Sequence, residues 1–540
     1  MVDIKIELIK FLVHNLFIKT VLKINYMKKL IWILTLLIST ISFAQKTEEL
    51  TKYSKVITAD ALKAKLSVIA SAEMEGRETA SPGQKKAAAY IESEFKRMGL
   101  KPGNGDSYQQ TYPVYQDILT EKNIAVNGKS FAWDTDFTFS LQTIITGKWD
   151  FNNVVFAGYG IVDDAKGIND YNGLDVKGKM VLVLEGSSAG VPTMGQGGNR
   201  AFNANPASPM SKMRAAIAKG ATGILTVSAN FPRKVATETK GSMYLKKNDA
   251  AGFLMANIST AVANSILGKA ATSVNDLASN NKGDYPTSLA ITATKTTTNL
   301  ESSNVIAYLP GTDKKDEYLF LTGHYDHLGK RGNVIYYGAD DDGSGTVGVM
   351  QMAEAFAAAA KAGKSPRRTI VFMTVSGEEK GLWGSQYYSE HPLFPLEKTT
   401  ADLNTDMIGR VDTERKTGDT LSYVYVIGHD KLSSELVTIN EDANKKSSNI
   451  TLDYKYDDPN DKNMIYYRSD HYNFAKKGVP ILFFYDGMLL ADYHQPTDTI
   501  EKINFDLMQK RTVMVYYTAC EIANREEMLK RDIPLNMPAR

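Results

Sequence analysis

A histidine and a run of aspartates in the second half of the chain have the types and spacing of metal ligands. His324 directly follows the apolar run YLFLTG, and the later segment GADDDGSG contains Asp340, Asp341 and Asp342 in succession. Acids favour the first turn of a helix, so capping explains one or two of them. Three adjacent carboxylates repel one another, and a bound dication would relieve that repulsion. We therefore expect a cation site at this loop.

More imidazole and carboxylate side chains follow other predicted strands. Glu378 and Glu379 come directly after RTIVFMTV, and His494 lies in DYHQPTDT, past the apolar run VPILFFYDG. Asp406 lies among apolar residues in ADLNTDMIG, where a carboxylate needs a charged partner. Adjacent carboxylates at a sheet edge are costly unless one binds metal and the other holds or takes a proton. The two glutamates are therefore expected to differ in role.

From about Glu301 onward, apolar strand patterns, polar loops and helical patterns alternate, as in EYLFLTG, TVGVMQMAEAFAAAAK and RRTIVFMTVSG. This order predicts an α/β fold with a mixed, mostly parallel central sheet flanked by helices. Ligands of such sheets bind at the carboxyl ends of the strands. The candidate ligands are therefore expected to meet at one edge of the sheet.

Together these loops offer two imidazoles, three ligand carboxylates and one spare carboxylate, which is the inventory of a two-metal hydrolytic site. Mixed imidazole and carboxylate ligands favour zinc over magnesium or calcium, with cobalt or manganese as substitutes. Two dications carry more positive charge than three carboxylates return. This surplus is expected to lower the pKa of a bridging water and make a hydroxide available near neutral pH.

The chain divides where its composition changes. We expect an upstream segment and signal peptide over 1–44, a helical first part of the catalytic domain over 45–116, an inserted apical domain over 117–295, and the main catalytic part over 296–540. The 117–295 segment is rich in short strand patterns and Gly, Asn and Ser turns. It contains no histidine, which makes it a poor place for a zinc site.

The segment from Met27 to Ala44 has the pattern of a secretory signal. It reads MKKLIWILTLLISTISFA, with two lysines, an apolar run and a small-x-small ending. The run is too short to span a bilayer comfortably. We expect translation to start at Met27 and the mature protein to begin near Gln45, exported to the periplasm or the extracellular space without a stable membrane span. A retained N-terminal anchor is the alternative.

Charge and cysteine content limit the partners. The 540-residue chain has 63 basic and 61 acidic residues and a formal net charge of +2, so no basic field gathers nucleic acid phosphates. The single cysteine, Cys520, excludes an intramolecular disulfide, and its apolar helical context predicts a buried small hydrophobe. We expect peptide substrates and no nucleic acid partner, and the oligomeric state stays open.

The motifs HYDH, GADDDGSG, SGEEKGLWGS, NTDMIG, RSDHYNF and DYHQPTDT stand in the order of the co-catalytic zinc aminopeptidases. From about Glu301 to its end the chain resembles this family, which includes bacterial leucyl aminopeptidase and has glutamate carboxypeptidase and the transferrin receptor as relatives. The EGR...SPG segment near Gly76 and Gly83 shares the resemblance. The resemblance implies a zinc-exopeptidase-like fold and an exported aminopeptidase that hydrolyses N-terminal residues from peptides.

The resemblance also implies how two Zn²⁺ ions are held. Asp341 bridges both ions, His324 and Asp406 complete one site, and Glu379 and His494 complete the other. The bond from Asp341 to Asp342 matches a position that is usually a cis peptide.

Other side chains take supporting roles in the same resemblance. Glu378 becomes the general base, and Asp326 lies behind His324, whose tautomer it can fix because residues two apart in an extended segment point the same way. Tyr466 matches a tyrosine that stabilises the tetrahedral intermediate in some relatives, with the adjacent Tyr467 as the alternative.

A substrate pocket is expected beside these residues. Its apolar walls are predicted to be Met407, Phe483, Phe484 and Tyr485. Arg468 or Arg410 could instead meet a substrate carboxylate, which keeps a carboxypeptidase of the same family as an alternative.

Two further alternatives are glutaminyl cyclase, with one working zinc, and an inactive binding or receptor protein on this scaffold. The filled ligand set argues against both. The segments FAGYGI, YNGLDVKGKMVLVLEG and MRAAIAKGATGILTV resemble the protease-associated domain, which would cover or narrow the cleft.

Overall fold

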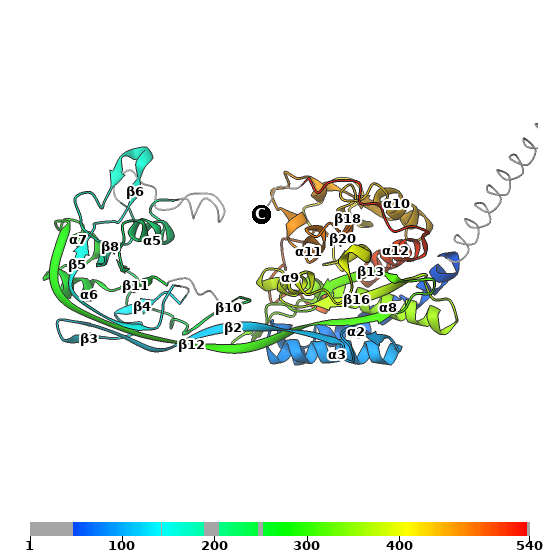
Figure 1. Ribbon diagram of the computed structural model, residues 1–540, viewed down its shortest axis with the longest axis horizontal. Coiled ribbons are helices and arrows are strands. Elements are labelled where there is room, and N and C mark those ends of the chain that lie inside the picture. The colour runs from blue at the N-terminus through cyan, green and yellow to red at the C-terminus, as the bar shows by residue number, and fades with distance from the viewer. Residues whose placement is uncertain (1–46, 142, 188–204, 247–251, 537–540) are drawn as a thin grey trace, which may run out of the picture. The chain divides into compact units, whose positions relative to one another are not determined.

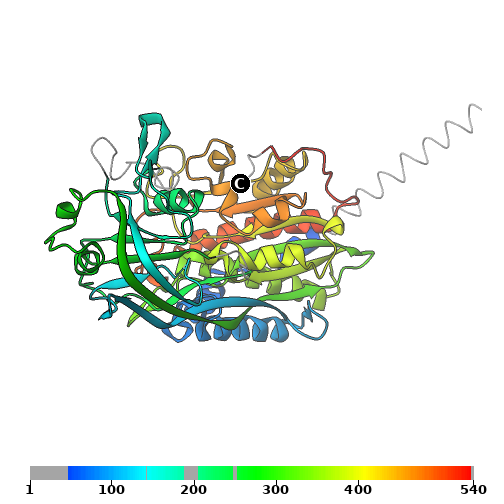
Figure 2. The same ribbon diagram turned by 60° about the vertical axis from the view of Figure 1, so that its left-hand side comes forward.

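The computed structural model describes residues 47–141, 143–187, 205–246 and 252–536. Two compact units divide the chain: one combines the residues up to Tyr112 with Glu301–Arg540, and the other comprises Pro113–Leu300. In the first unit the blue amino-terminal helices lie with the yellow-to-red carboxyl-terminal part (Figures 1 and 2). The predicted signal segment, Met27 to Ala44, lies outside the described residues.

A mixed sheet forms the centre of the first unit. Its strands follow the order β19 (Thr451–Asp453), β18 (Tyr423–Ile427), β20 (Ile481–Tyr485), β17 (Thr399–Thr405), β13 (Lys314–His324), β16 (Arg368–Val375) and β12 (Gly283–Leu309). Strands β20, β17, β13 and β16 are parallel neighbours, whereas β18 and β12 run antiparallel to β20 and β16. The predicted α/β class with a mixed, mostly parallel sheet is confirmed.

Alternation along the central strand β13 divides the apolar side chains between two layers of helices. Leu319 and Leu321 pack in a core cluster with Phe356 of α8, whereas Phe320, between them, packs with Tyr388 and Phe474 on the other face. Cys520 lies buried in the first cluster, as its sequence context predicts.

The helices of the first face are α2 (Ala59–Ile69), α3 (Pro82–Met98), α8 (Gly345–Lys361), α10 (Leu436–Lys446) and α12 (Phe505–Asn524). Those of the second face are α9 (Trp383–Glu390) and α11 (His471–Ala475). Figure 1 labels these helices around β13, β16 and β20.

The glycine that begins α8 lets this helix start against the sheet. A Cβ on Gly345 would lie 2.2 Å from the carbonyl oxygen of Thr405, at the end of β17. Only glycine accommodates so close an approach. The GSG that follows the three aspartates thus places the first turn of α8 beside the strand that precedes Asp406.

In the second unit β12 pairs with further strands, and the unit has its own apolar clusters. Strands β5 (Gly147–Phe156), β8 (Met180–Leu184), β9 (Gly223–Val227) and β11 (Leu254–Ile258) are parallel, and β4 (Phe137–Phe139) runs antiparallel to β11. Its helices are α5 (Pro209–Ala218), α6 (Thr260–Leu267) and α7 (Val274–Leu277). Its likeness to a protease-associated domain stays a prediction.

Shorter or connecting strands complete the list of described strands: β1 (Lys101–Pro102), β2 (Gln109–Val126), β3 (Lys129–Phe131), β6 (Val162–Asp163), β7 (Ile168–Asn169), β10 (Lys240–Tyr244), β14 (Lys330–Arg331) and β15 (Val334–Ile335). Within the described ranges, no helix has both the length and the apolar character that crossing a membrane requires.

Candidate metal centre

Strand ends bring the predicted ligands to one edge of the first unit's sheet. His324 ends β13, Glu379 follows β16, Asp406 follows β17, and His494 lies in the loop after β20. The four strands are parallel neighbours, so their carboxyl ends meet at the same edge. Asp341, in the loop that precedes α8, lies among them.

Asp341 stands between two groups of ligand atoms. Its Oδ1 lies 3.3 Å from His324 Nε2, and its Oδ2 lies 3.1 Å from His494 Nε2. Asp406 Oδ1 is 3.6 Å from the same His324 nitrogen, and Glu379 Oε2 is 3.1 Å from the same His494 nitrogen. The five predicted ligands therefore form two adjoining groups that share Asp341.

A third imidazole, which the sequence argument did not assign, joins the second group. His327 Nδ1 lies 2.7 Å from Glu379 Oε1 and 3.8 Å from Asp341 Oδ2. Among the described residues, both ring nitrogens of His327 and these two carboxylate oxygens are buried without a hydrogen-bond partner. His327 Nδ1 and the two carboxylate oxygens lie together, and a bound cation would satisfy all three. The signal was present in HYDH, but the spacing argument stopped at His324 and Asp326.

The electrostatics of the cluster favour added positive charge. Burial opposes a charge on His494, yet Asp341 and Glu379 raise its pKa to about 10. Burial and Asp341 would raise the pKa of Glu379, yet His327 and His494 lower it to about 2. The carboxylates stabilise positive charge in this cluster, and bound dications would supply it. The imidazole and carboxylate ligands fit two zinc ions.

The three consecutive aspartates have different tasks. Asp342 accepts hydrogen bonds from the backbone N–H groups of His324, Gly345 and Met407, at 3.1, 2.8 and 2.9 Å. Asp340 accepts from the Gly409 N–H at 2.8 Å. Their carboxylates therefore fix the loops around the centre, while Asp341 alone of the three faces the imidazoles. The peptide bond between Asp341 and Asp342 is cis, as the family resemblance implies.

Asp326 positions both His324 and Glu378. Its Oδ1 lies 3.6 Å from His324 Nδ1 and accepts the Glu378 backbone N–H at 3.2 Å. Its Oδ2 accepts a hydrogen bond from the Thr79 hydroxyl at 2.7 Å. The same His324 nitrogen is 3.1 Å from the backbone oxygen of Asp326. These contacts leave Nε2 of His324 directed at the cluster, as metal ligation requires.

Arg77, in the EGR segment, holds the loops that carry the centre. Its fully buried guanidinium donates to the carbonyl oxygens of Tyr325, Tyr337 and Gly338 at 2.7, 2.7 and 2.9 Å. These carbonyls flank His324 on one side and Asp341 on the other. Sequence reasoning noted the motif but could not assign it this task.

Glu378 lies at the mouth of the cluster rather than within it. Its Oε2 is 3.9 Å from His324 Nε2, and its side chain is 13% exposed, whereas that of Glu379 is 3% exposed and is held by two imidazoles. Burial raises the pKa of Glu378 well above its usual range, although His324 opposes this. The two neighbouring glutamates are thus separated by geometry into one enclosed and one accessible carboxylate.

A cavity adjoins the first group of ligands. Besides His324, Asp341, Asp406 and Glu378, it is lined by Met407, Ile465, Arg468, Phe483, Tyr485, Leu489 and Tyr493. Three of the four predicted apolar walls are therefore present. Phe484 is a correction: it lies in the core cluster with Leu482 and Leu403, because successive side chains of β20 point to opposite faces.

The predicted tyrosine is also not at the cavity. Tyr466 packs edge-on against His471, and Lys431 Nζ lies 5.6 Å from its ring centroid. Tyr485 lines the cavity instead, and its buried hydroxyl has no hydrogen-bond partner among the described residues. Tyr493 also lines the cavity, but its hydroxyl already accepts a hydrogen bond from Arg468, so the hydroxyl proposed for a substrate is that of Tyr485.

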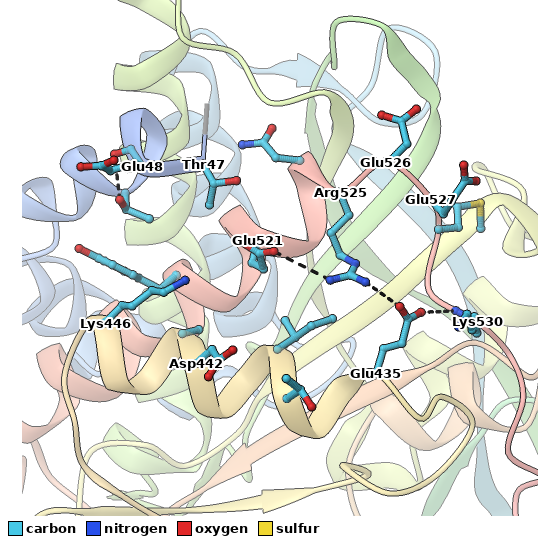
Figure 3. Close-up of a pocket in the computed structure, with 17 residues that line it drawn as sticks. Thr47, Glu48, Glu435, Asp442, Lys446, Glu521, Arg525, Glu526, Glu527 and Lys530 are labelled. Carbon is cyan, nitrogen blue, oxygen red and sulfur yellow. Dashed lines mark hydrogen bonds and ion pairs between the residues drawn. The ribbon is translucent and has the colours of Figure 1, made fainter. Parts of the chain in front are cut away.

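A larger hollow of about 920 Å³ lies elsewhere in the first unit, between α10 and the end of α12 (Figure 3). Glu435, Glu521 and Arg525 line it, with Arg525 paired to Glu435 at 2.6 Å. None of the candidate metal ligands or Glu378 is among its lining residues. Its size therefore does not make it the reaction site.

A third His and Asp group is neutralised by a lysine. His429, Asp430 and Asp457 lie close enough to hold a cation. However, Lys431 Nζ lies 3.0 Å from Asp457 and 2.6 Å from Asp430. The ammonium already occupies the place of a cation there.

The parallel sheet edge gathers two joined His and carboxylate groups beside an accessible glutamate, an arrangement that suits hydrolysis with two metal ions. Residues 304–519 match the family model described as Peptidase family M28. This region is therefore similar to peptidase family M28.

Relatives with known sequences support the same family. A "Probable leucine aminopeptidase" of Trichophyton verrucosum is 30% identical over 227 residues, which are 41% of this chain and 57% of that protein. A "Probable zinc metalloprotease" of Pyricularia oryzae is 37% identical over 112 residues, 20% of this chain and 21% of that protein. The chain thus spans little more than half the length of the first relative.

Two solved structures share the fold over nearly the whole chain. An aminopeptidase from Aneurinibacillus sp. strain AM-1 has a TM-score of 0.50 at 18% identity, covering 92% of this chain and 98% of its own. A zinc aminopeptidase from Bacillus subtilis has a TM-score of 0.50 at 20% identity, covering 88% and 99%.

His327→Gln is expected to weaken zinc binding at the second group by about tenfold to a hundredfold, the usual cost of losing a side chain that supports a metal site. Competition with a chromophoric chelator would measure both dissociation constants. His391→Gln is the matched control, because His391 is exposed and, among the described residues, its ring contacts the Tyr387 carbonyl at 3.1 Å and the Tyr387 ring but no candidate metal ligand. Equal zinc affinities in the two variants would show that His327 does not support the ion.

Proposed function

We propose that this protein is a zinc-dependent aminopeptidase that removes N-terminal residues from peptides. The observation that carries the proposal is the pair of His and carboxylate groups sharing Asp341, beside a cavity at whose mouth Glu378 stands. The names of the fungal and bacterial relatives support both the metal and the reaction.

The zinc ions, when bound, would polarise the scissile carbonyl and make water acidic enough to attack near neutral pH. Asp341, Asp406, Glu379 and the imidazoles would hold them. Glu378 would take the proton from the attacking water and pass it to the departing amine, because its carboxylate is accessible while that of Glu379 is not. Tyr485 would donate its free hydroxyl to the oxyanion.

Charge near the cavity bears on the choice between the two ends of a peptide. Bound zinc would use the charge of Asp341, Glu379 and Asp406, which leaves Glu378 as the lining carboxylate that could meet an ammonium group of the substrate. Arg410, named with Arg468 as a carboxylate receptor, is paired with Asp492 at 2.9 Å and does not line the cavity. Of the two arginines that could meet a substrate carboxylate in a carboxypeptidase, Arg468 alone lines the cavity.

The purified protein is expected to hydrolyse leucine p-nitroanilide and to carry two zinc ions per chain by elemental analysis. N-acetylation of the substrate should abolish cleavage, since it removes the ammonium. A chelator should remove activity and added zinc restore it. Cleavage of a blocked peptide from its C-terminus, with none from a free N-terminus, would establish the carboxypeptidase alternative instead.

The proposal extends to export, for which the support is the signal-like sequence from Met27 to Ala44. Expression in a bacterial host should give a processed protein outside the cytoplasm that begins near Gln45. N-terminal sequencing of the recovered protein would test this, and retention of Met1 or Met27 would contradict it.

A further inference from the structure

A second cavity, of about 340 Å³, adjoins Glu378. It shares Glu378, Arg468 and Tyr493 with the cavity at the metal cluster, and none of the candidate metal ligands lines it. Its other walls include Tyr467, Tyr472 and Lys476. A cavity of this size takes a small group of the substrate.

The charges on its walls are mainly positive. Arg468 and Lys476 are its basic lining residues, and Glu378 is its only acidic one. The guanidinium of Arg468 is half-buried and donates to the Tyr493 hydroxyl at 3.0 Å. Across the described ranges, no ion pair within 4.0 Å joins Arg468 or Lys476 to a carboxylate, and Glu378 and Glu390 act on them only at longer range. Both cations are therefore available to an anionic group.

The proposed proton transfer from Glu378 to the departing amine places the second cavity beside the leaving group of the substrate. The cavity at the cluster, of about 30 Å³, is lined by candidate metal ligands and by apolar walls, so we place the scissile carbonyl there. Glu378 passes its proton to the departing amine, so that amine must lie beside Glu378, and the residue attached to it continues away from the metal cluster. The cavity that opens there is the one lined by Arg468 and Lys476.

We propose that this second cavity binds a carboxylate carried by the residue after the scissile bond, through Arg468 and Lys476. This inference rests on the proposed aminopeptidase function and names its substrate class. The carboxylate is either the free carboxyl end of a dipeptide or the side chain of an acidic second residue. A planar guanidinium pairs with either in two parallel hydrogen bonds, and the ammonium adds a point charge.

Two matched substrate pairs distinguish the sources of the carboxylate. Leu-Gly against leucyl-glycinamide tests the free carboxyl end, and Leu-Glu-amide against Leu-Gln-amide tests the acidic side chain. We expect kcat/KM to be about tenfold higher for the carboxylate member of at least one pair, as for a charge-assisted hydrogen bond in a partly buried site. A ratio near one in both pairs would overturn the inference.

Two variants test whether Arg468 and Lys476 cause the preference for a substrate with a carboxylate. In Lys476→Gln and Arg468→Gln the carboxylate-to-neutral ratio should fall toward one. Lys477→Gln, a change at the exposed neighbouring lysine that does not line the cavity, should keep the ratio. A ratio that persists in both cavity variants would place the carboxylate elsewhere. Leucine p-nitroanilide separates the two failures: if it is not cleaved, the aminopeptidase function fails, and if it is cleaved while the ratios are one, only the carboxylate site fails.

Discussion

Glu378→Gln is expected to lower kcat about ten-thousandfold while both zinc ions remain bound. General acid and base catalysis contributes about a hundredfold to ten-thousandfold, and here one carboxylate would serve both water activation and protonation of the leaving amine. The amide keeps the size of the side chain and the backbone bond to Asp326, so the fold is not expected to change. Turnover with leucine p-nitroanilide and zinc content by elemental analysis would be measured together.

The adjacent residue supplies the matched control. Glu379 contacts His327 at 2.7 Å and His494 at 3.1 Å, so Glu379→Gln is expected to lose zinc from the second group as well as activity. The two substitutions change the same chemistry at neighbouring positions, and their zinc contents should differ. Near-normal turnover in Glu378→Gln with full zinc would contradict the general-base role, and loss of zinc there would mean that the two glutamates have exchanged roles.

The convergence of His324, Glu379, Asp406 and His494 was predictable because each follows an apolar strand pattern. Parallel neighbouring strands end at one edge, so residues far apart in sequence meet there without any knowledge of side-chain packing. The same reasoning gave the fold class, since alternating strands and helices leave few ways to cover both faces of a sheet. Local sequence patterns were sufficient to predict a ligand wherever its place depended on the position of a strand end.

Where the orientation of one side chain decided the outcome, local patterns were insufficient. Phe484 was expected in the pocket with Phe483 and Tyr485, but the two-residue period of a strand turns it into the core. Tyr466 was expected at the oxyanion, but it packs against His471, and the cavity is lined by Tyr485 instead. Both differences follow from packing.

Contacts between distant segments were the other part that the sequence could not supply. Asp498 accepts the backbone N–H of Asp341 at 3.1 Å, and Arg77 reaches carbonyl groups on both sides of the centre. Neither residue was predicted as a metal ligand, and each acts by holding a loop. Among three equal carboxylates, only these three-dimensional contacts show why Asp341 faces the imidazoles while its neighbours bind backbone.

Asp341→Ala is expected to remove both zinc ions and to lower kcat/KM by at least about a thousandfold, since Lewis-acid catalysis is worth several kcal/mol of barrier. The reason is the position of its two oxygens: Oδ1 lies 3.3 Å from His324 and Oδ2 lies 3.1 Å from His494, so the carboxylate belongs to both groups. Its backbone bond to Asp498 does not use the side chain and should hold the loop in place.

The zinc content of Asp406→Ala provides the comparison for Asp341→Ala. Asp406 contacts His324 at 3.6 Å, and no ion pair within the described ranges joins it to the second group, so its loss should remove one ion and leave the other. Zinc per chain should therefore fall to about one in Asp406→Ala and to about zero in Asp341→Ala, measured after gel filtration in metal-free buffer. Circular dichroism would establish that both variants are folded. One zinc retained in folded Asp341→Ala would show that this carboxylate serves a single ion, because a ligand shared by two ions cannot be removed without weakening both.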